Sequence, residues 1–174
     1  MESSPNRLAA DAGSRIVLGK MMHERLSPKD VEEIVAVGAG PVDESGDTVG
    51  AKLDKVGREK YLAGQRSHQA ALAASVLAEY LAFGQVEPEG RQAAINYLAG
   101  LMESPEAAAR REGVSSTYEA GLLDNPLFRK KVEALTADKD ETVRELAKMK
   151  LKQWETLRGE WLKSRGLRDV GIPE

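Results

Sequence analysis

The chain has 174 residues, of which 41% are hydrophobic and 30% are charged. This composition is typical of a folded globular protein and excludes a disordered one, and the length suffices for one domain or a short repeat array. There is no cysteine, which excludes disulfides, zinc–thiolate sites and cysteine nucleophiles. Aromatic residues make up only 5%, while Ala, Leu, Glu, Lys and Arg are plentiful, so the composition favours helices.

Charge and hydropathy narrow the class of partner. A net charge of −3 gives no general attraction to nucleic acid. Residues 124–168 nevertheless hold 12 Lys and Arg against 8 Asp and Glu, so this part is basic and the remainder is acidic. No segment approaches the roughly 18–20 apolar residues that span a bilayer. Residues 1–7 also lack the apolar run of a signal peptide. We therefore expect a cytoplasmic protein with no membrane contact.

Residues 1–37 are predicted to form an N-terminal tail and a helical pair. Apolar residues recur at loose helical spacing from Leu8 to Leu26, which indicates the first helix. The second helix begins after Ser27, a typical N-cap that is followed by a proline and an acidic first turn, and it stops at Gly38. Residues 38–51 are rich in glycine and acidic side chains, so we expect a loop there.

Residues 52–166 are predicted to form a helical array. The first long helix of this array is expected to break or bend at Gly64. It then becomes almost wholly apolar from Ala70 to Phe83, which is typical of a centrally buried helix. A glycine and a proline shortly afterwards end it. Residues 167–174 are expected to form a tail.

The second half of the chain contains an internal repeat. Residues 101–110 align with residues 135–144, and this offset matches the length of a helix–turn–helix unit. The last helix of the second copy is extended, because an apolar stripe at spacings of three and four residues continues from Val143 to Trp161. This stripe predicts a helix of roughly 20 residues, about 30 Å long, which we expect to cap the array.

The second copy, residues 132–151, resembles a HEAT repeat, a pair of antiparallel helices that stack into a solenoid. The resemblance implies that Asp138 is the acid of the inter-helix turn and that Arg144 bonds back to that turn. Ser104 and Arg110 are their counterparts one unit earlier. The sequence therefore predicts an all-α fold, a short HEAT-like α-solenoid of helical hairpins with an N-terminal helical pair.

Candidate partner-binding residues lie on the last helix. Lys148 and Lys152 share a face, and Arg158 lies roughly along it. Trp161 lies beyond the end of the repeat, where it serves either as an anchor for a partner or as a cap that closes the core. Acidic residues interleave with these cations and weaken their field, which disfavours nucleic acid as the ligand; they are Glu141, Glu145, Glu155 and Glu160.

The best functional hypothesis is a non-enzymatic interaction module, an adaptor or scaffold for a protein partner. We expect no cofactor and no metal. The acidic loop from Asp43 to Asp54 resembles a calcium loop but carries Thr48 where that loop needs glycine. The alternatives are a small helical enzyme or enzyme subunit using acidic residues with His23 or His68, and a nucleic-acid-associated protein using the basic helices. The sequence leaves self-association open.

Overall fold

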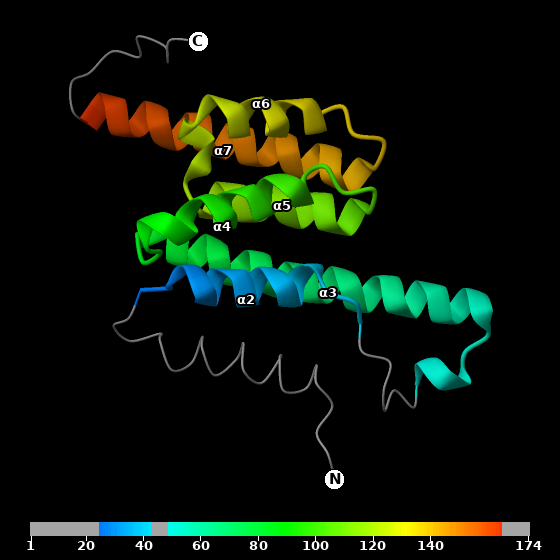
Figure 1. The fold of residues 1–174 in the computed structure, drawn as a ribbon. Coiled ribbons are helices and arrows are strands. Elements are labelled where there is room, and N and C mark those ends of the chain that lie inside the picture. Colours follow the sequence, from blue (N-terminus) through cyan, green and yellow to red (C-terminus); the bar gives the residue numbers. More distant parts are fainter. Residues whose placement is uncertain (1–24, 43–48, 165–174) are drawn as a thin grey trace. The chain divides into compact units, whose positions relative to one another are not determined.

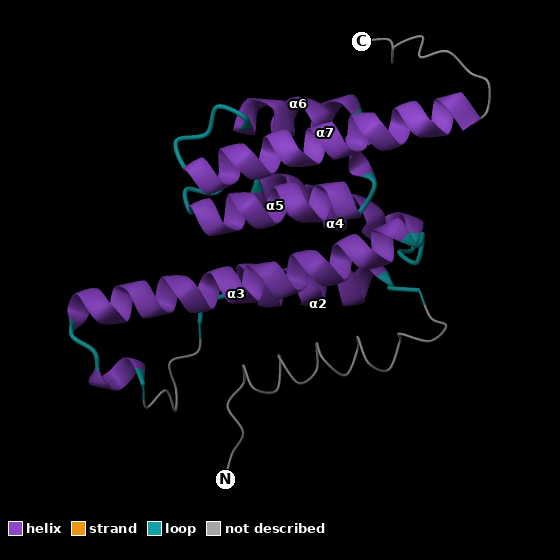
Figure 2. Cartoon of the chain, turned by 180° about the vertical axis from the view of Figure 1, so that it is seen from behind, coloured by secondary structure: helices purple, strands orange, loops and turns teal. Residues whose placement is uncertain are grey.

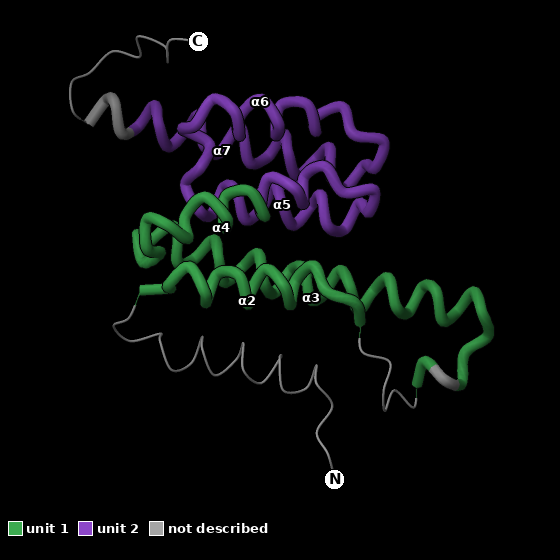
Figure 3. Tube along the Cα trace, viewed as in Figure 1, with its two compact units in different colours: residues 1–97 green, residues 98–174 purple. Residues whose placement is uncertain are grey.

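The computed structural model describes residues 25–42 and 49–164, apart from the side chains of residues 51 and 161–164. Every regular element in this part of the chain is a helix, which confirms the all-α prediction there (Figure 1). Leu26 and Val86 form an isolated parallel bridge. Among the described helices none is long and apolar enough to cross a membrane. The chain divides into two compact units, residues 1–97 and 98–174 (Figure 3).

The first unit begins with α2, Pro28–Ala39, whose start follows from its sequence. The hydroxyl of Ser27 accepts a hydrogen bond from the backbone N–H of Asp30, and the carboxylate of Asp30 accepts one from the N–H of Ser27 at 2.8 Å. This reciprocal capping box satisfies two donors of the first turn. The predicted serine cap is therefore confirmed, and the helix ends one residue beyond the predicted Gly38.

Helix α2 packs along α3, Lys55–Ala82, and both ribbon views show the pair side by side (Figures 1 and 2). A short 3₁₀ helix, η1 (Gly50–Lys52), precedes α3. The core of this unit takes Val31 and Ile34 from α2 and small residues such as Ala73 and Ala74 from α3. Apolar residues from Ala70 onward are buried along one face of α3 only, since Leu72 is 55% and Phe83 is 71% exposed. The predicted central burial of this run is therefore wrong for its outer face.

Gly38 permits α2 to lie very close to Tyr97 and Ala73. A Cβ atom at this position would lie 2.1 Å from the hydroxyl of Tyr97 and 2.5 Å from the Cβ of Ala73. Tyr97 belongs to the part of α4 (Pro88–Leu101) that lies in the first unit, and its hydroxyl donates to the carbonyl of Ala70 at 3.4 Å. Burial raises the pKa of this phenol to about 12, because the charged form loses its hydration.

The second unit contains α5 (Ala107–Glu119), a 3₁₀ helix η2 (Leu122–Asp124), α6 (Pro126–Leu135) and α7 (Glu141–Ser164). Helix α7 packs against both α5 and α6, as Figures 1 and 2 agree. The large apolar side chains of this core that are fully buried are Leu98, Val114, Leu123, Phe128, Val132 and Val143. The extended last helix is confirmed, since α7 has 24 residues.

Two local predictions have other outcomes. The expected break at Gly64 is wrong, because α3 runs through this position as one helix of 28 residues. The alternative, a bend at Gly64, stays a prediction. A single exposed glycine costs a helix only about 1 kcal/mol, which the packing along the rest of α3 outweighs. The predicted helix from Leu8 to Leu26 lies outside the described residues up to residue 24, and Leu26 itself is in the bridge.

Candidate functional site

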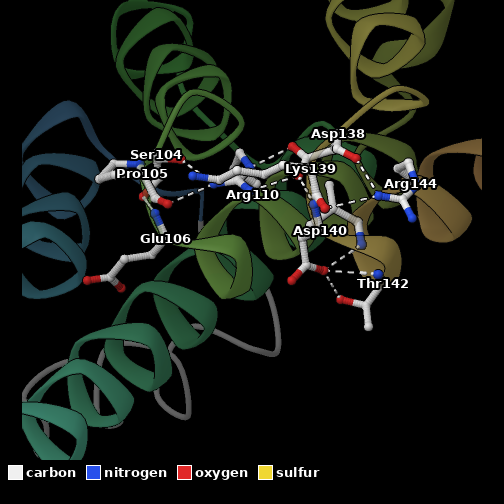
Figure 4. A network of polar contacts seen from close by, with 10 residues as sticks. Ser104, Pro105, Glu106, Arg110, Asp138, Lys139, Asp140, Thr142 and Arg144 are labelled. Carbon is white, nitrogen blue, oxygen red and sulfur yellow. Dashed lines mark hydrogen bonds and ion pairs between the residues drawn. The ribbon is translucent and has the colours of Figure 1, made fainter.

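Two arginines of the second unit bind the turns that precede their own helices in the same way. Arg110 on α5 donates from Nη1 to the carbonyls six and five residues earlier, Ser104 at 2.8 Å and Pro105 at 2.9 Å. Arg144 on α7 donates from Nη1 to the carbonyls six and five residues earlier, at 2.7 and 3.0 Å (Figure 4). The bond from Arg144 back to its turn, implied by the repeat pattern, is confirmed, and Arg110 makes the same contact.

Ser104 and Asp138, at aligned positions of the two turns, accept equivalent hydrogen bonds. The hydroxyl of Ser104 accepts from the N–H of Glu106 at 3.2 Å, and at the aligned position of the second copy Asp138 accepts from the N–H of Asp140 at 2.8 Å. Asp140 then caps α7, since its carboxylate accepts from the hydroxyl and N–H of Thr142 and from the next N–H. These bonds lower the pKa of Asp140, the hydroxyl bond most strongly. Glu106 makes no side-chain cap, so the first copy is less complete.

Arg110 has a further partner that the repeat pattern does not reveal. Its Nε and Nη2 donate to the two carboxylate oxygens of Asp138 at 2.7 and 2.8 Å, and both side chains are 7% exposed (Figure 4). This bidentate bond raises the pKa of Arg110 and lowers the pKa of Asp138. Arg110 thus joins its own turn to the next one. Nearby, Lys131 of α6 forms an ion pair with Glu103.

The predicted cations of α7 are in different surroundings. Lys148 is 54% exposed and lies 2.9 Å from Glu145, whose pKa it lowers by a hydrogen bond. Lys152 is exposed one turn further along the same face. Arg158 instead lies over the ring of Trp154, 5.3 Å from its centroid. Ten residues separate it from Lys148, which rotates it by about 80° around the helix.

Trp154 on α7 contacts residues of its own unit through both its indole N–H and its ring. Its indole N–H donates to the carboxylate of Asp124 at 2.9 Å, and a second guanidinium, from Arg129, also lies 5.3 Å from the ring centroid. Beyond this point the apolar stripe loses its cover, because Leu157 is 57% exposed. Trp161 lies in the last turn of α7, but its side chain falls outside the described residues, so both hypotheses for its role stay predictions.

The residues of the alternative hypotheses are not brought together in the described structure. His23 and residues 43–48 of the acidic loop lie outside it. Asp54, the last position of the loop that resembles a calcium site, caps α3 by accepting from the N–H of Gly57 at 2.8 Å. In residues 25–42 and 49–164 no group of three or more His, Cys, Asp or Glu side chains is arranged to hold a metal ion.

Comparisons of the chain with protein-family models, with curated proteins and with solved structures gave no match. The fold class rests on the described residues themselves, which form an all-α protein. Its second unit holds two turns that are bound alike by arginines at aligned positions of the internal repeat.

Proposed function

We propose that the chain is a non-enzymatic protein-interaction module, an adaptor or scaffold that presents α7 to a protein partner. The observation that carries this proposal is the recurrence of one turn geometry, in which Arg110 and Arg144 bind the carbonyls six and five residues earlier. Recurring hairpins that stack on one another are characteristic of repeat proteins, whose function is to offer extended rigid surfaces. On this proposal the hairpins form a short HEAT-like solenoid.

The hydrogen bonds of Arg110, Asp138, Asp140 and Arg144, which we call the turn network, support a rigid start of α7. The Arg110–Asp138 pair is bidentate and shielded from solvent, and such a pair fixes orientation as well as distance. Asp140 then fixes the first turn of α7 through its cap. A surface that is ordered before binding loses less conformational entropy when a partner docks.

The exposed side of α7 supplies the contact surface in this proposal. It carries Lys148 and Lys152, together with one exposed apolar neighbour, Met149, at 45% exposure. A mixture of cationic and apolar groups fits a protein partner better than a phosphate backbone. The pairing of Lys148 with Glu145 further weakens the field that nucleic acid requires.

The test is capture of partners from a lysate of the source cells with the immobilised full chain. We compare wild type with the double variant Lys148→Glu/Lys152→Glu and with a matched control, Lys60→Glu/Lys130→Glu, which makes the same charge change at exposed positions on α3 and α6. A discrete protein that is retained by wild type and by the control but lost with the α7 variant supports the proposal. Capture of nucleic acid alone, or of no macromolecule, refutes it.

A further inference from the structure

We propose that Arg144, Lys148 and Lys152 form a receptor for an acidic helical segment of a protein partner, with the open edge of the Arg144 guanidinium holding one carboxylate. We call these three residues the α7 stripe. This inference rests on the proposed function and names the chemistry of the partner. It comes from comparing α7 with α5, which occupies the same position one repeat earlier.

The guanidinium groups of Arg110 and Arg144 bind equivalent turn carbonyls, but only that of Arg110 also binds a carboxylate. In Arg110, Nη1 binds the turn carbonyls while Nε and Nη2 point to the carboxylate of Asp138 (Figure 4). In Arg144, Nη1 binds the equivalent carbonyls, and Nε and Nη2 have no acceptor among the described residues. Because the shared anchor orients both forks, Arg144 offers the donor edge that Arg110 uses to bind a carboxylate.

The face of α5 that carries Arg110 is covered by the next hairpin. Arg110 binds Asp138 in the turn before α7, Val114 one turn later is fully buried, and the ring of Tyr118 lies 4.3 Å from the ammonium group of Lys150 on α7. Residues at this four-residue spacing therefore form the docking face that one hairpin presents to the next.

The equivalent positions on α7 are the α7 stripe. Shifting the three α5 positions by the length of the internal repeat gives Arg144, Lys148 and Lys152. Lys148 is 54% exposed, whereas its counterpart Val114 is fully buried. The same face that is partly apolar and covered on α5 is thus cationic and uncovered by described residues on α7. A face with this pattern selects a partner by charge.

Charge complementarity decides the occupant. Arg144 and Lys152 have no carboxylate partner in the described part of the chain, and Lys148 has only the exposed Glu145. Three cations at intervals of four residues span about 12 Å along the helix, so carboxylates at the same interval on a second helix match them. The first of these carboxylates takes the position toward Arg144 that Asp138 takes toward Arg110. The occupant is therefore an acidic helix of a different protein.

The test uses the full chain and a synthetic alanine-based peptide with Glu at every fourth position; its control has Gln at those positions. The peptide is about 16 residues long, because shorter isolated helices are marginal in water. The arginine Nε–Hε signals are followed by ¹H–¹⁵N NMR, and the signal of Arg144 is assigned by its absence in Arg144→Lys. The Glu peptide is expected to shift the Arg144 signal saturably and to leave Arg110 unmoved. The Gln peptide is expected to shift neither signal.

Two variants separate recognition from folding. Arg144→Lys keeps the charge but loses the fork, so the affinity for the Glu peptide is expected to fall about tenfold. Lys148→Gln/Lys152→Gln leaves the turn network intact and is expected to weaken the same binding several-fold. A single-stranded oligonucleotide of the same charge as the Glu peptide serves as a further comparison. Weaker binding of the oligonucleotide than of the peptide supports an acidic helix as the ligand.

The inference is overturned if the Arg144 signal does not move at millimolar peptide, if the oligonucleotide binds more tightly, or if dilution shows that a second copy of the chain covers Arg144. Its failure differs from failure of the proposed function. A chain that still captures a protein through another face loses only the α7 stripe as receptor, whereas a chain that captures no protein loses both.

Discussion

Replacing Asp138 by alanine is the most informative change to the second unit. The substitution removes both bonds from Arg110, at 2.7 and 2.8 Å, and the bond from the N–H of Asp140 at 2.8 Å. It leaves the charge of Arg110, which is 7% exposed, with only two carbonyl acceptors. Breaking a shielded ion pair from one side is expensive because the remaining charge stays desolvated. We expect a loss of about 3 kcal/mol in the free energy of unfolding.

Arg144→Ala is the matched comparison. It removes an arginine that, like Arg110, binds its turn through two carbonyls, but this side chain is half-buried and pairs with no carboxylate among the described residues. Water replaces much of what is lost, so the expected cost is about 1 kcal/mol. The contribution of the Arg110–Asp138 pair is estimated by comparing Arg144→Ala with Arg110→Ala, because these two arginines share the same carbonyl anchor.

Urea denaturation followed by tryptophan fluorescence measures both costs. The two tryptophans of the chain, Trp154 and Trp161, belong to the second unit, so the signal reports the unit that carries the change. A double-mutant cycle between Arg110→Ala and Asp138→Ala is expected to show strong coupling. Equal costs for Asp138→Ala and Arg144→Ala, or negligible coupling, would refute the view that this pair joins the two turns.

Three further predictions concern acidity and packing. Folding lowers the pKa of Asp138, so the stabilisation that its carboxylate provides is complete above its unfolded pKa of about 4. This stabilisation is lost as the pH falls through the lower pKa of the folded state. In urea titrations, wild type is therefore expected to lose more stability below pH 4 than Asp138→Asn. Gly38→Ala is expected to destabilise the first unit by about 1–3 kcal/mol, because the new Cβ clashes with Tyr97. Gly64→Ala has no atom within 4 Å of the new Cβ and is expected to stabilise α3 by up to about 1 kcal/mol. Hydrogen exchange of the first unit measures both effects. Trp154→Phe keeps an aromatic ring near the guanidinium groups but loses its indole donor, with an expected cost of about 1 kcal/mol by circular dichroism.

Local features of this fold were readable from the sequence. The start of α2 was predicted because Ser27 is a typical N-cap followed by a proline and an acidic first turn. The structure adds the reciprocal bond to the carboxylate of Asp30. The contact between Arg144 and its turn was implied by the resemblance to a HEAT repeat, and it is local, since it spans only six residues. The Arg110–Asp138 pair was not, because its members lie 28 residues apart and meet only when one hairpin packs on the next.

Positions of single residues on α7 were harder to predict than the helix itself. The apolar stripe correctly indicated a long helix, but it did not reveal which faces would be covered. Arg158 was expected roughly along the face of Lys148, whereas the rotation of the helix brings it over Trp154. Ideal helix geometry already rotates a residue ten positions further on by about 80°, so spacing alone could have separated Arg158 from this face. Which side of α7 is covered depends on α5 and α6, and the spacing does not reveal it.

Lysine footprinting shows most directly whether the exposed side of α7 binds a protein. The full chain, alone and in the complex captured from lysate, is treated with a limiting amine-acetylating reagent and analysed by mass spectrometry. Lys148 and Lys152 are expected to react several-fold more slowly in the complex, while the exposed Lys60 and Lys130 react equally in both samples. Unchanged reactivity of Lys148 and Lys152 beside protection elsewhere would contradict binding through this side of α7.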